Sequence, residues 1–181
     1  MAPPCATLPD YVDSGLRVLS VGLNPSLVSV REGFYFANPR NRFWRAFDES
    51  GLAGSRGEPS RSRHQVLLEQ DRIGFTDVVK RPSRQGHELR ARDFRCDAPR
   101  LLQLIEEIQP TWAWFHGKQA YRYFLKYAIG LSPREIRWGL QSRMIGEARV
   151  YVTPNPSPAN AAYSLADLRR RYRRLARHVN A

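Results

Sequence analysis

The apolar residues of this chain fall first into short continuous runs, which are typical of buried β-strands. Three such runs, rich in β-branched and aromatic residues, are expected to be strands over residues 16–23, 73–79 and 111–116. Residues 143–145 and 149–153 are expected to pair as a hairpin across Gly146 and Glu147. Residues 130–142 show no regular period and are expected to be irregular.

Between these runs, apolar residues recur at the three- and four-residue spacing that marks one face of a helix. Leu101, Leu104, Ile105 and Ile108 keep this spacing until Pro110 ends the segment. Asn38 followed by Pro39 predicts another helix start. Further helices are expected over residues 64–70, 118–128 and 165–179, the last after a capping box at Ser164 and Asp167. Strands that alternate with helices predict an α/β fold with a short, mostly parallel central sheet.

A chain of 181 residues fits one domain with a core of its own. The sequence has no internal repeat or linker, so residues 1–181 are interpreted as one domain with a flexible N-terminal segment at 1–14. No apolar run approaches the ~18 residues of a membrane span, and the start lacks the features of a secretory signal. We therefore expect a cytoplasmic protein with no membrane association.

The balance of charge indicates the kind of partner. The formal net charge is +12, and only three of the 29 basic residues are lysines. A strongly basic protein favours a polyanion, because binding releases the counterions that surround it. The two cysteines, Cys5 and Cys96, are too few for an iron–sulfur cluster, and no histidine spacing suggests zinc. Nucleic acid is the expected partner, with no metal and no cofactor.

Two Asn-Pro pairs stand where predicted strands end. Asn24-Pro25 opens a long loop that reaches Asn38, and Asn155-Pro156 opens a second proline-rich loop. Proline pushes the preceding asparagine into an extended conformation, which can aim its amide at a bound water or a base edge. One such pair is ordinary turn chemistry, but two pairs at strand ends predict a ligand site there.

The residues around these pairs resemble a known family. Gly22-Leu-Asn-Pro-Ser26 and Gly33-Phe-Tyr-Phe-Ala-Asn-Pro-Arg-Asn-Arg-Phe-Trp44 are similar to the first motif of the mismatch-specific uracil/thymine DNA glycosylases, in the uracil-DNA glycosylase superfamily. Shorter matches follow in the same order: Gly74-Phe-Thr-Asp-Val-Val-Lys-Arg-Pro82, Gly117-Lys-Gln-Ala-Tyr121, Trp138-Gly139 and Asn155-Pro-Ser157. The resemblance covers roughly residues 15–176.

This resemblance implies a three-layer α/β/α sandwich and a monofunctional glycosylase that acts on mismatched or damaged double-stranded DNA, as a monomer, without a covalent enzyme intermediate. By position, Asn24 matches the asparagine that orients the attacking water, and Phe36 matches the aromatic that stacks on the flipped base. Leu23, Ser26, Ser29, Asn41 and Asn155 are expected near the base. The loop that enters the duplex is expected to include Ser157, Pro158, Ala159, Asn160 and Ala161.

The chain departs from the family at three places. Ser26 replaces a glycine, and Pro158-Ala-Asn-Ala161 lacks the bulky wedge of relatives, so that Asn160 is the remaining candidate. Asp77 stands where some relatives carry lysine. Its carboxylate is expected either to activate water or stabilise the sugar cation, or else to cap the strand end or pair with Arg81.

Two alternatives follow from these departures. The pocket could prefer hypoxanthine or xanthine, or the protein could bind damaged DNA without cleaving it. Retention of Asn24 together with Phe36 argues against the second alternative. His116 is expected to pack or to form a hydrogen bond, and the arginine-rich face of the last helix is expected to be mainly solvated.

Overall fold

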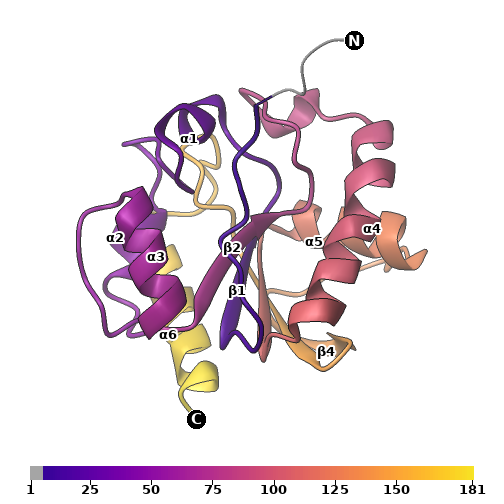
Figure 1. Cartoon of the computed structure of the whole chain (residues 1–181). Coiled ribbons are helices and arrows are strands. Elements are labelled where there is room, and N and C mark those ends of the chain that lie inside the picture. The colour runs from indigo at the N-terminus through magenta and orange to yellow at the C-terminus, as the bar shows by residue number, and fades with distance from the viewer. Residues whose placement is uncertain (1–5) are drawn as a thin grey trace.

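A computed structural model describes residues 6–181 of the chain and shows a three-layer α/β/α sandwich (Figure 1). The central sheet has five strands in the order β2-β1-β3-β5-β4. The strands are β1 (Val18–Gly22), β2 (Ile73–Asp77), β3 (Trp112–His116), β4 (Gly139–Ile145) and β5 (Ala148–Thr153). The first three and β5 are parallel, and β4 runs antiparallel at one edge. The predicted fold class is confirmed.

The described residues contain six α-helices. They are α1 (Leu27–Glu32), α2 (Phe43–Phe47), α3 (Arg61–Gln70), α4 (Ala91–Ile108), α5 (Lys118–Phe124) and α6 (Leu165–Val179). A 3₁₀ turn lies at Gly86–Glu88, and a π-helical turn at Leu125–Ile129 extends α5. In Figure 1, α2, α3 and α6 lie on one face of the sheet and α4 and α5 on the other.

Each face of the sheet has its own hydrophobic core, because successive side chains of a strand point to opposite faces. Leu19 and Val21 of β1 belong to the core beneath α4 and α5. Val18 belongs to the core beneath α2 and α6, with Phe43 and Trp114. Four more strand positions face this second side: Ser20, Gly22, Asp77 and His116. The polar side chains among them therefore lie beside the second core.

Several boundaries differ from the sequence-based expectations for local reasons. The loop after Asn24 contains α1, whose first turn is capped by Ser26. The helix expected from Pro39 begins at Phe43, because Asn38 and Asn41 turn the chain by accepting hydrogen bonds from the backbone N–H groups of Arg40 and Phe43. The capping box at Ser164 and Asp167 is present as predicted.

Two further elements are longer than their sequence patterns indicated. Helix α4 starts ten residues before Leu101, at Ala91, and accommodates Pro99 within it. Strand β4 occupies residues 139–145, part of which was expected to be irregular. This edge strand exposes Leu140 and Met144, so its alternation of apolar and polar positions is weak.

Part of the N-terminal segment, which was expected to be flexible, packs against the sheet. Residues 1–5, including Cys5, lie outside the described residues. Leu8 is fully buried, and Tyr11 forms two backbone hydrogen bonds with Phe75 of β2, at 2.8 and 2.9 Å. Asp10 forms ion pairs with Lys80 and Arg100. The segment from residue 8 to residue 11 is therefore an integral edge of the sandwich.

Within residues 6–181, no helix is both long and apolar enough to cross a membrane. The same residues contain no cluster of three or more acidic, histidine or cysteine side chains arranged to hold a metal ion. Cys96, the cysteine that the structure describes, is exposed and unpaired.

Candidate active site

A cavity of about 920 Å³ opens at the carboxyl ends of the parallel strands. Gly22, Asp77 and His116, the last residues of β1, β2 and β3, lie along its floor. Its walls include nearly all the residues that the sequence predicted for the site: Leu23, Asn24, Ser26, Ser29, Phe36, Asn41, Asn155, Ser157, Pro158, Ala159 and Asn160. Ala161 is exposed and is not part of the lining.

The side chain of Asn24 is held in one orientation by its surroundings. Its amide nitrogen Nδ2 donates to the backbone oxygen of Arg81 at 3.0 Å and to Ser83 Oγ at 2.8 Å, with a weaker contact to Pro25 O at 3.3 Å. Carbonyl oxygens accept hydrogen bonds only, so these contacts fix which end of the amide is nitrogen. The amide oxygen Oδ1 is the atom left to meet a ligand at the cavity wall.

Phe36 forms an aromatic wall beside this asparagine. Its ring stacks on Phe43 with the centroids 4.0 Å apart, and it meets the edge of His116 at 5.2 Å. The backbone φ of Phe36 is 58°, in the left-handed region that a bulky residue rarely adopts. Such strain, of order 1–3 kcal/mol, is typical of functional sites. The remaining face of the ring is the natural platform for a flat ligand.

Ser26 has a local structural task that a glycine could not perform. Its Oγ accepts a hydrogen bond from the backbone N–H of Ser29 and thereby caps α1. Ser29 is buried and accepts hydrogen bonds from Ser26 Oγ at 3.1 Å and from the backbone N–H of Ala37 at 3.3 Å. The two serines therefore tie α1 to the segment that carries Phe36.

Asp77 ends β2 with its carboxyl group buried at the floor of the cavity. Its Oδ1 lies where a Cβ atom on Gly22 would stand, so the neighbouring strand needs glycine at that position. The other oxygen, Oδ2, is buried without a hydrogen-bond partner among the described residues. Burial raises the pKa of Asp77 to about 7, the positive charges of Lys80 and Arg100 oppose that rise, and the carboxylate of Asp10 adds to it.

The two structural alternatives for Asp77, a strand-end cap and a pairing with Arg81, stay predictions. Among the described residues, Oδ2 of Asp77 has no hydrogen-bond partner. Arg81 has other partners, because its guanidinium group donates to Asp93 Oδ2 at 2.9 Å and to the backbone oxygen of Glu88 at 2.7 Å. The backbone oxygen of Asp77, by contrast, is well anchored by Arg100 Nη2 at 2.7 Å.

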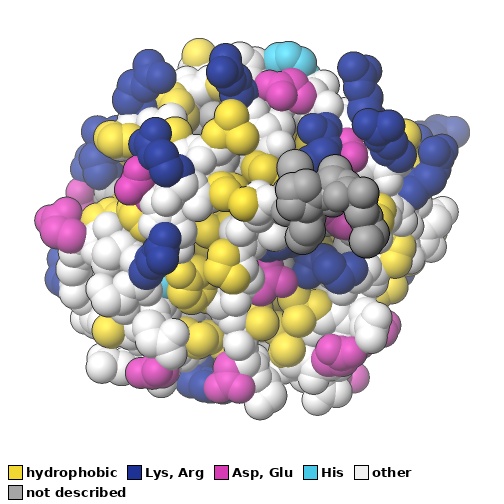
Figure 2. Space-filling model, turned by 45° about the horizontal axis from the view of Figure 1, so that its top comes forward, with side chains coloured by type: hydrophobic (Ala, Val, Ile, Leu, Met, Phe, Trp, Pro, Cys, Tyr) yellow, Lys and Arg dark blue, Asp and Glu magenta, His cyan; other side chains and the backbone are white. Residues whose placement is uncertain are grey.

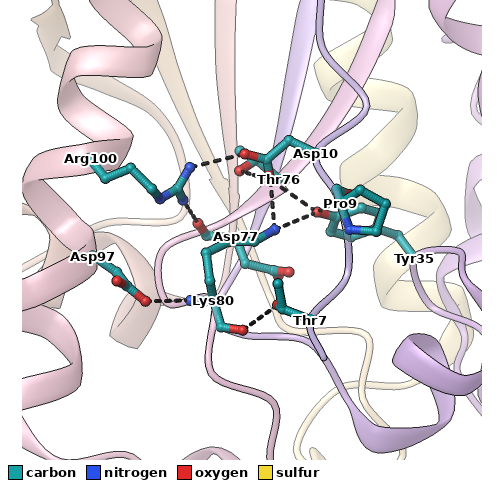
Figure 3. Close-up of polar contacts among 9 residues, drawn as sticks. All are labelled: Thr7, Pro9, Asp10, Tyr35, Thr76, Asp77, Lys80, Asp97 and Arg100. Carbon is teal, nitrogen blue, oxygen red and sulfur yellow. Dashed lines mark hydrogen bonds and ion pairs between the residues drawn. The ribbon is translucent and has the colours of Figure 1, made fainter. Parts of the chain in front are cut away.

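A partly buried polar network beside Asp77 was not found from the sequence (Figure 3). Asp10 lies at its centre and accepts hydrogen bonds from Lys80 Nζ at 2.7 Å, Thr76 Oγ1 at 2.8 Å and Arg100 Nη1 at 3.0 Å. Lys80 also donates to the hydroxyl oxygen of Tyr35 at 3.2 Å. This network surrounds the Asp77 carboxyl with charges of both signs and holds the end of β2 rigidly.

His116 occupies the floor on the other side of Gly22. One of its ring nitrogens, Nε2, lies 2.8 Å from Ser20 Oγ, which confirms the expectation of a packed, hydrogen-bonded histidine. Complete burial lowers its pKa to about 3, so the ring is neutral at physiological pH. His116 and Asp77 therefore both lie at the cavity floor, and burial lowers the pKa of the histidine while it raises that of the aspartate.

The loop from residue 155 to residue 161, called here the insertion loop, forms the outer lip of the cavity. Asn155 Oδ1 accepts from the backbone N–H of Ser157 at 2.9 Å, and Asn160 Nδ2 donates to the backbone oxygen of Asn155 at 3.0 Å. Pro158 and Ala159 form the exposed tip. Arg42, which was not singled out from the sequence, reaches under this loop and contacts its carbonyl groups.

Basic side chains surround the cavity. Figure 2 shows lysine and arginine side chains distributed around the face at which the strands end. Arg40, Arg84 and Lys118 belong to the cavity lining itself. Several arginines of α6 are committed elsewhere, since Arg169 and Arg173 pair with Glu49. Part of the positive charge that an anionic partner can reach therefore lies at the rim of the cavity.

Comparisons with known proteins concern the fold and the family of this chain. The fold is similar to a solution NMR structure from Methanosarcina acetivorans described as a "putative Uracil DNA glycosylase", with a TM-score of 0.61 at 22% sequence identity, over 97% of this chain and 98% of that chain. Likeness at this level of identity concerns the fold. The sequence itself matches the family model of the uracil DNA glycosylase superfamily over residues 9–177. The chain belongs to the uracil DNA glycosylase superfamily.

Proposed function

We propose that this chain is a monofunctional, mismatch-directed DNA glycosylase that flips uracil out of duplex DNA and hydrolyses its bond to deoxyribose. The observation that carries the proposal is the pairing of Asn24 with Phe36 across one cavity. The asparagine amide is oriented by three hydrogen bonds, and the aromatic ring has one face covered by Phe43. An oriented acceptor for water and a flat platform for a base are what this reaction requires.

The chemistry follows from how charge develops along the reaction. As the N-glycosidic bond breaks, positive charge builds on the sugar and negative charge on the departing base. An amide is a weak base, so Asn24 acts by holding water beside the sugar carbon. Ionised Asp77 stabilises the developing cation and accepts the proton of that water. No bond forms between enzyme and sugar in this sequence of events.

Selectivity for mispaired bases follows from a balance of energies. Flipping a base costs a few kcal/mol and costs least when the base is already poorly paired. Stacking on the free face of Phe36 returns ~1–3 kcal/mol. Because the two nearly cancel, a mispaired uracil enters the cavity more readily than a well-paired base. The basic rim at Arg40, Arg84 and Lys118 binds the DNA backbone. The protein acts as a monomer in this proposal.

A second candidate is excision of hypoxanthine or xanthine, and the observation that favours it is the raised pKa of Asp77. With a pKa of about 7, this carboxyl group is partly protonated at neutral pH. A protonated carboxyl at the cavity floor can donate to a purine nitrogen as the base departs. This role would require the rate on purines to rise as the pH falls.

The proposal is tested with duplexes that carry one uracil, thymine, hypoxanthine or xanthine opposite each normal base. Each duplex is incubated with the protein, treated with alkali to break abasic sites, and resolved by length. We expect cleavage of uracil opposite guanine only after alkali treatment. Cleavage confined to purine lesions would favour the second candidate. Tight binding of uracil-containing duplex without base release would identify a non-catalytic binding protein and reject both.

A further inference from the structure

The insertion loop has little bulk with which to fill the gap that a flipped base leaves. Its exposed tip consists of Pro158 and Ala159, followed by Asn160 and the exposed Ala161. A large side chain can plug a gap while remaining mobile, but a small one has to be held in place. The function of this loop therefore depends on its backbone being kept in one shape.

Arg42 supplies that restraint from beneath the loop. Its backbone N–H and its Nε both donate to the backbone oxygen of Pro156, at 3.2 and 3.4 Å. Nη2 donates to the backbone oxygens of Ser157 and Asn160, at 2.7 and 2.8 Å. Nη1 donates to the backbone oxygen of Tyr163. One half-buried guanidinium group thus contacts three carbonyls from both arms of the loop and a fourth, that of Tyr163, just beyond it.

The partners of Arg42 in these contacts carry no formal charge. All are backbone oxygens, so the cation is engaged by peptide dipoles instead of by a carboxylate. A planar guanidinium group presents its donors in a fixed fork, which a lysine ammonium cannot reproduce. Both arms of the loop are consequently set relative to each other by the geometry of a single side chain.

Arg42 also joins the loop to the base pocket. It follows Asn41 directly, and Asn41 lines the cavity. Phe43, the next residue, is fully buried and supports the stacked ring of Phe36. The short segment from residue 36 to residue 43 therefore carries the base platform at one end and the restraint of the loop at the other.

We propose that Arg42 is a positioning residue that holds the insertion loop rigid, so that its small tip can occupy the gap left in the duplex by the flipped base. This inference rests on the proposed glycosylase function. Rigidity of the backbone here replaces the bulk of a wedge side chain. Arg42 contacts neither the base nor the sugar, and its effect is confined to substrates in which a stacked gap has to be filled.

The test compares Arg42→Gln, Arg42→Lys and the matched control Arg173→Gln, which removes one positive charge from an exposed arginine of α6. Two substrates carry the same uracil strand. In one the uracil lies opposite guanine in a duplex, and in the other it lies in an unpaired bubble that leaves no stacked gap. We expect Arg42→Gln to lower kcat/KM on the duplex by about tenfold or more and on the bubble by less than about threefold. Arg42→Lys should lie between, and Arg173→Gln should affect both substrates alike.

Amide hydrogen exchange of Ser157 and Asn160 provides a readout that needs no catalysis. Faster exchange in Arg42→Gln, with the rest of the protein unchanged, is expected. Equal losses on duplex and bubble, or unaltered exchange at these two amides, would overturn the role of Arg42. Failure of the wild-type protein to release uracil from either substrate would instead reject the glycosylase function, and the exchange experiment would still decide whether Arg42 restrains the loop.

Discussion

The ends of β1 and β2 lie side by side in the sheet and present polar groups that are prepared in opposite ways. Asn24, just beyond β1, is uncharged, and its amide nitrogen donates hydrogen bonds to Arg81 and Ser83 in the segment after β2. Asp77, at the end of β2, is ionisable, completely buried and has one oxygen without a partner. The orientation of the Asn24 amide is set by local hydrogen bonds, whereas the protonation of the Asp77 carboxyl is set by its burial and by the charges around it.

This difference suggests a division of labour. A side chain held by neutral hydrogen bonds keeps one orientation at any pH and suits the placing of water. A buried carboxyl whose pKa is near neutrality changes its charge in response to its surroundings and suits proton transfer. The site therefore combines Asn24, whose orientation is fixed, with Asp77, whose charge can change. Variants that lack one or the other should lose activity in distinguishable ways.

Removal of both groups should have the largest effect. The Asn24→Ala, Asp77→Asn double variant is expected to lose more single-turnover cleavage of uracil opposite guanine than either single variant does, between about tenfold and about a hundredfold. If both side chains act on one water, the double loss should fall short of the product of the two single losses. Single-turnover rates of all four proteins give this comparison. Strictly multiplicative losses would show that the two residues act independently.

Replacement of Asp77 alone should have a smaller, pH-dependent effect on the cleavage rate. Asp77→Asn preserves size and removes the charge, so we expect about a tenfold slower chemical step at pH 8. In the wild-type protein, the rate on uracil should fall as the pH drops through about 7, because Asp77 becomes protonated there. The variant should lack that fall. A wild-type rate that stays flat from pH 8 to pH 6 would remove Asp77 from the mechanism of uracil excision.

The same burial predicts a modest effect on stability. The pKa of Asp77 is raised to about 7 in the folded protein, above the ~3.9 of an unfolded aspartate. The folded state therefore binds the proton more tightly, and Asp77 makes the protein less stable as the pH rises from about 4 to about 7. Asp77→Asn should consequently melt at the same or a higher temperature than wild type at pH 8. A variant that melts several degrees lower would identify Asp77 as a structural residue.

Sequence reasoning located the ends of β1 and β5 because the signals that mark them are local. Proline after Asn24 and after Asn155 marks the points where strands stop, and the order of short motifs fixed their relation in the fold. The capping box at Ser164 needed only four consecutive residues. The α/β fold with a mostly parallel sheet followed from the alternation of apolar runs, which depends on the strand period and the helix period. The three-layer arrangement was implied by the family resemblance.

The surroundings of Asp77 and the support of the insertion loop could not be read in that way. Asp10 meets Lys80 and Arg100 only after the chain has folded, and it stands in a segment that was expected to be flexible. Arg42 contacts carbonyls more than a hundred positions away. An arginine that binds backbone oxygens leaves no complementary charge in the sequence, so no pairing pattern indicated its partners.

The most direct test of the whole account is the behaviour of Asn24→Ala on a duplex with uracil opposite guanine. Free uracil is measured under single-turnover conditions, and binding is measured separately with an uncleavable uracil analogue. The account predicts release of uracil by the wild-type protein and at least a tenfold slower release by the variant, about 1.4 kcal/mol of barrier, with affinity nearly unchanged. Equal losses in binding and in rate would contradict it, because Asn24 would then shape the loop without orienting water.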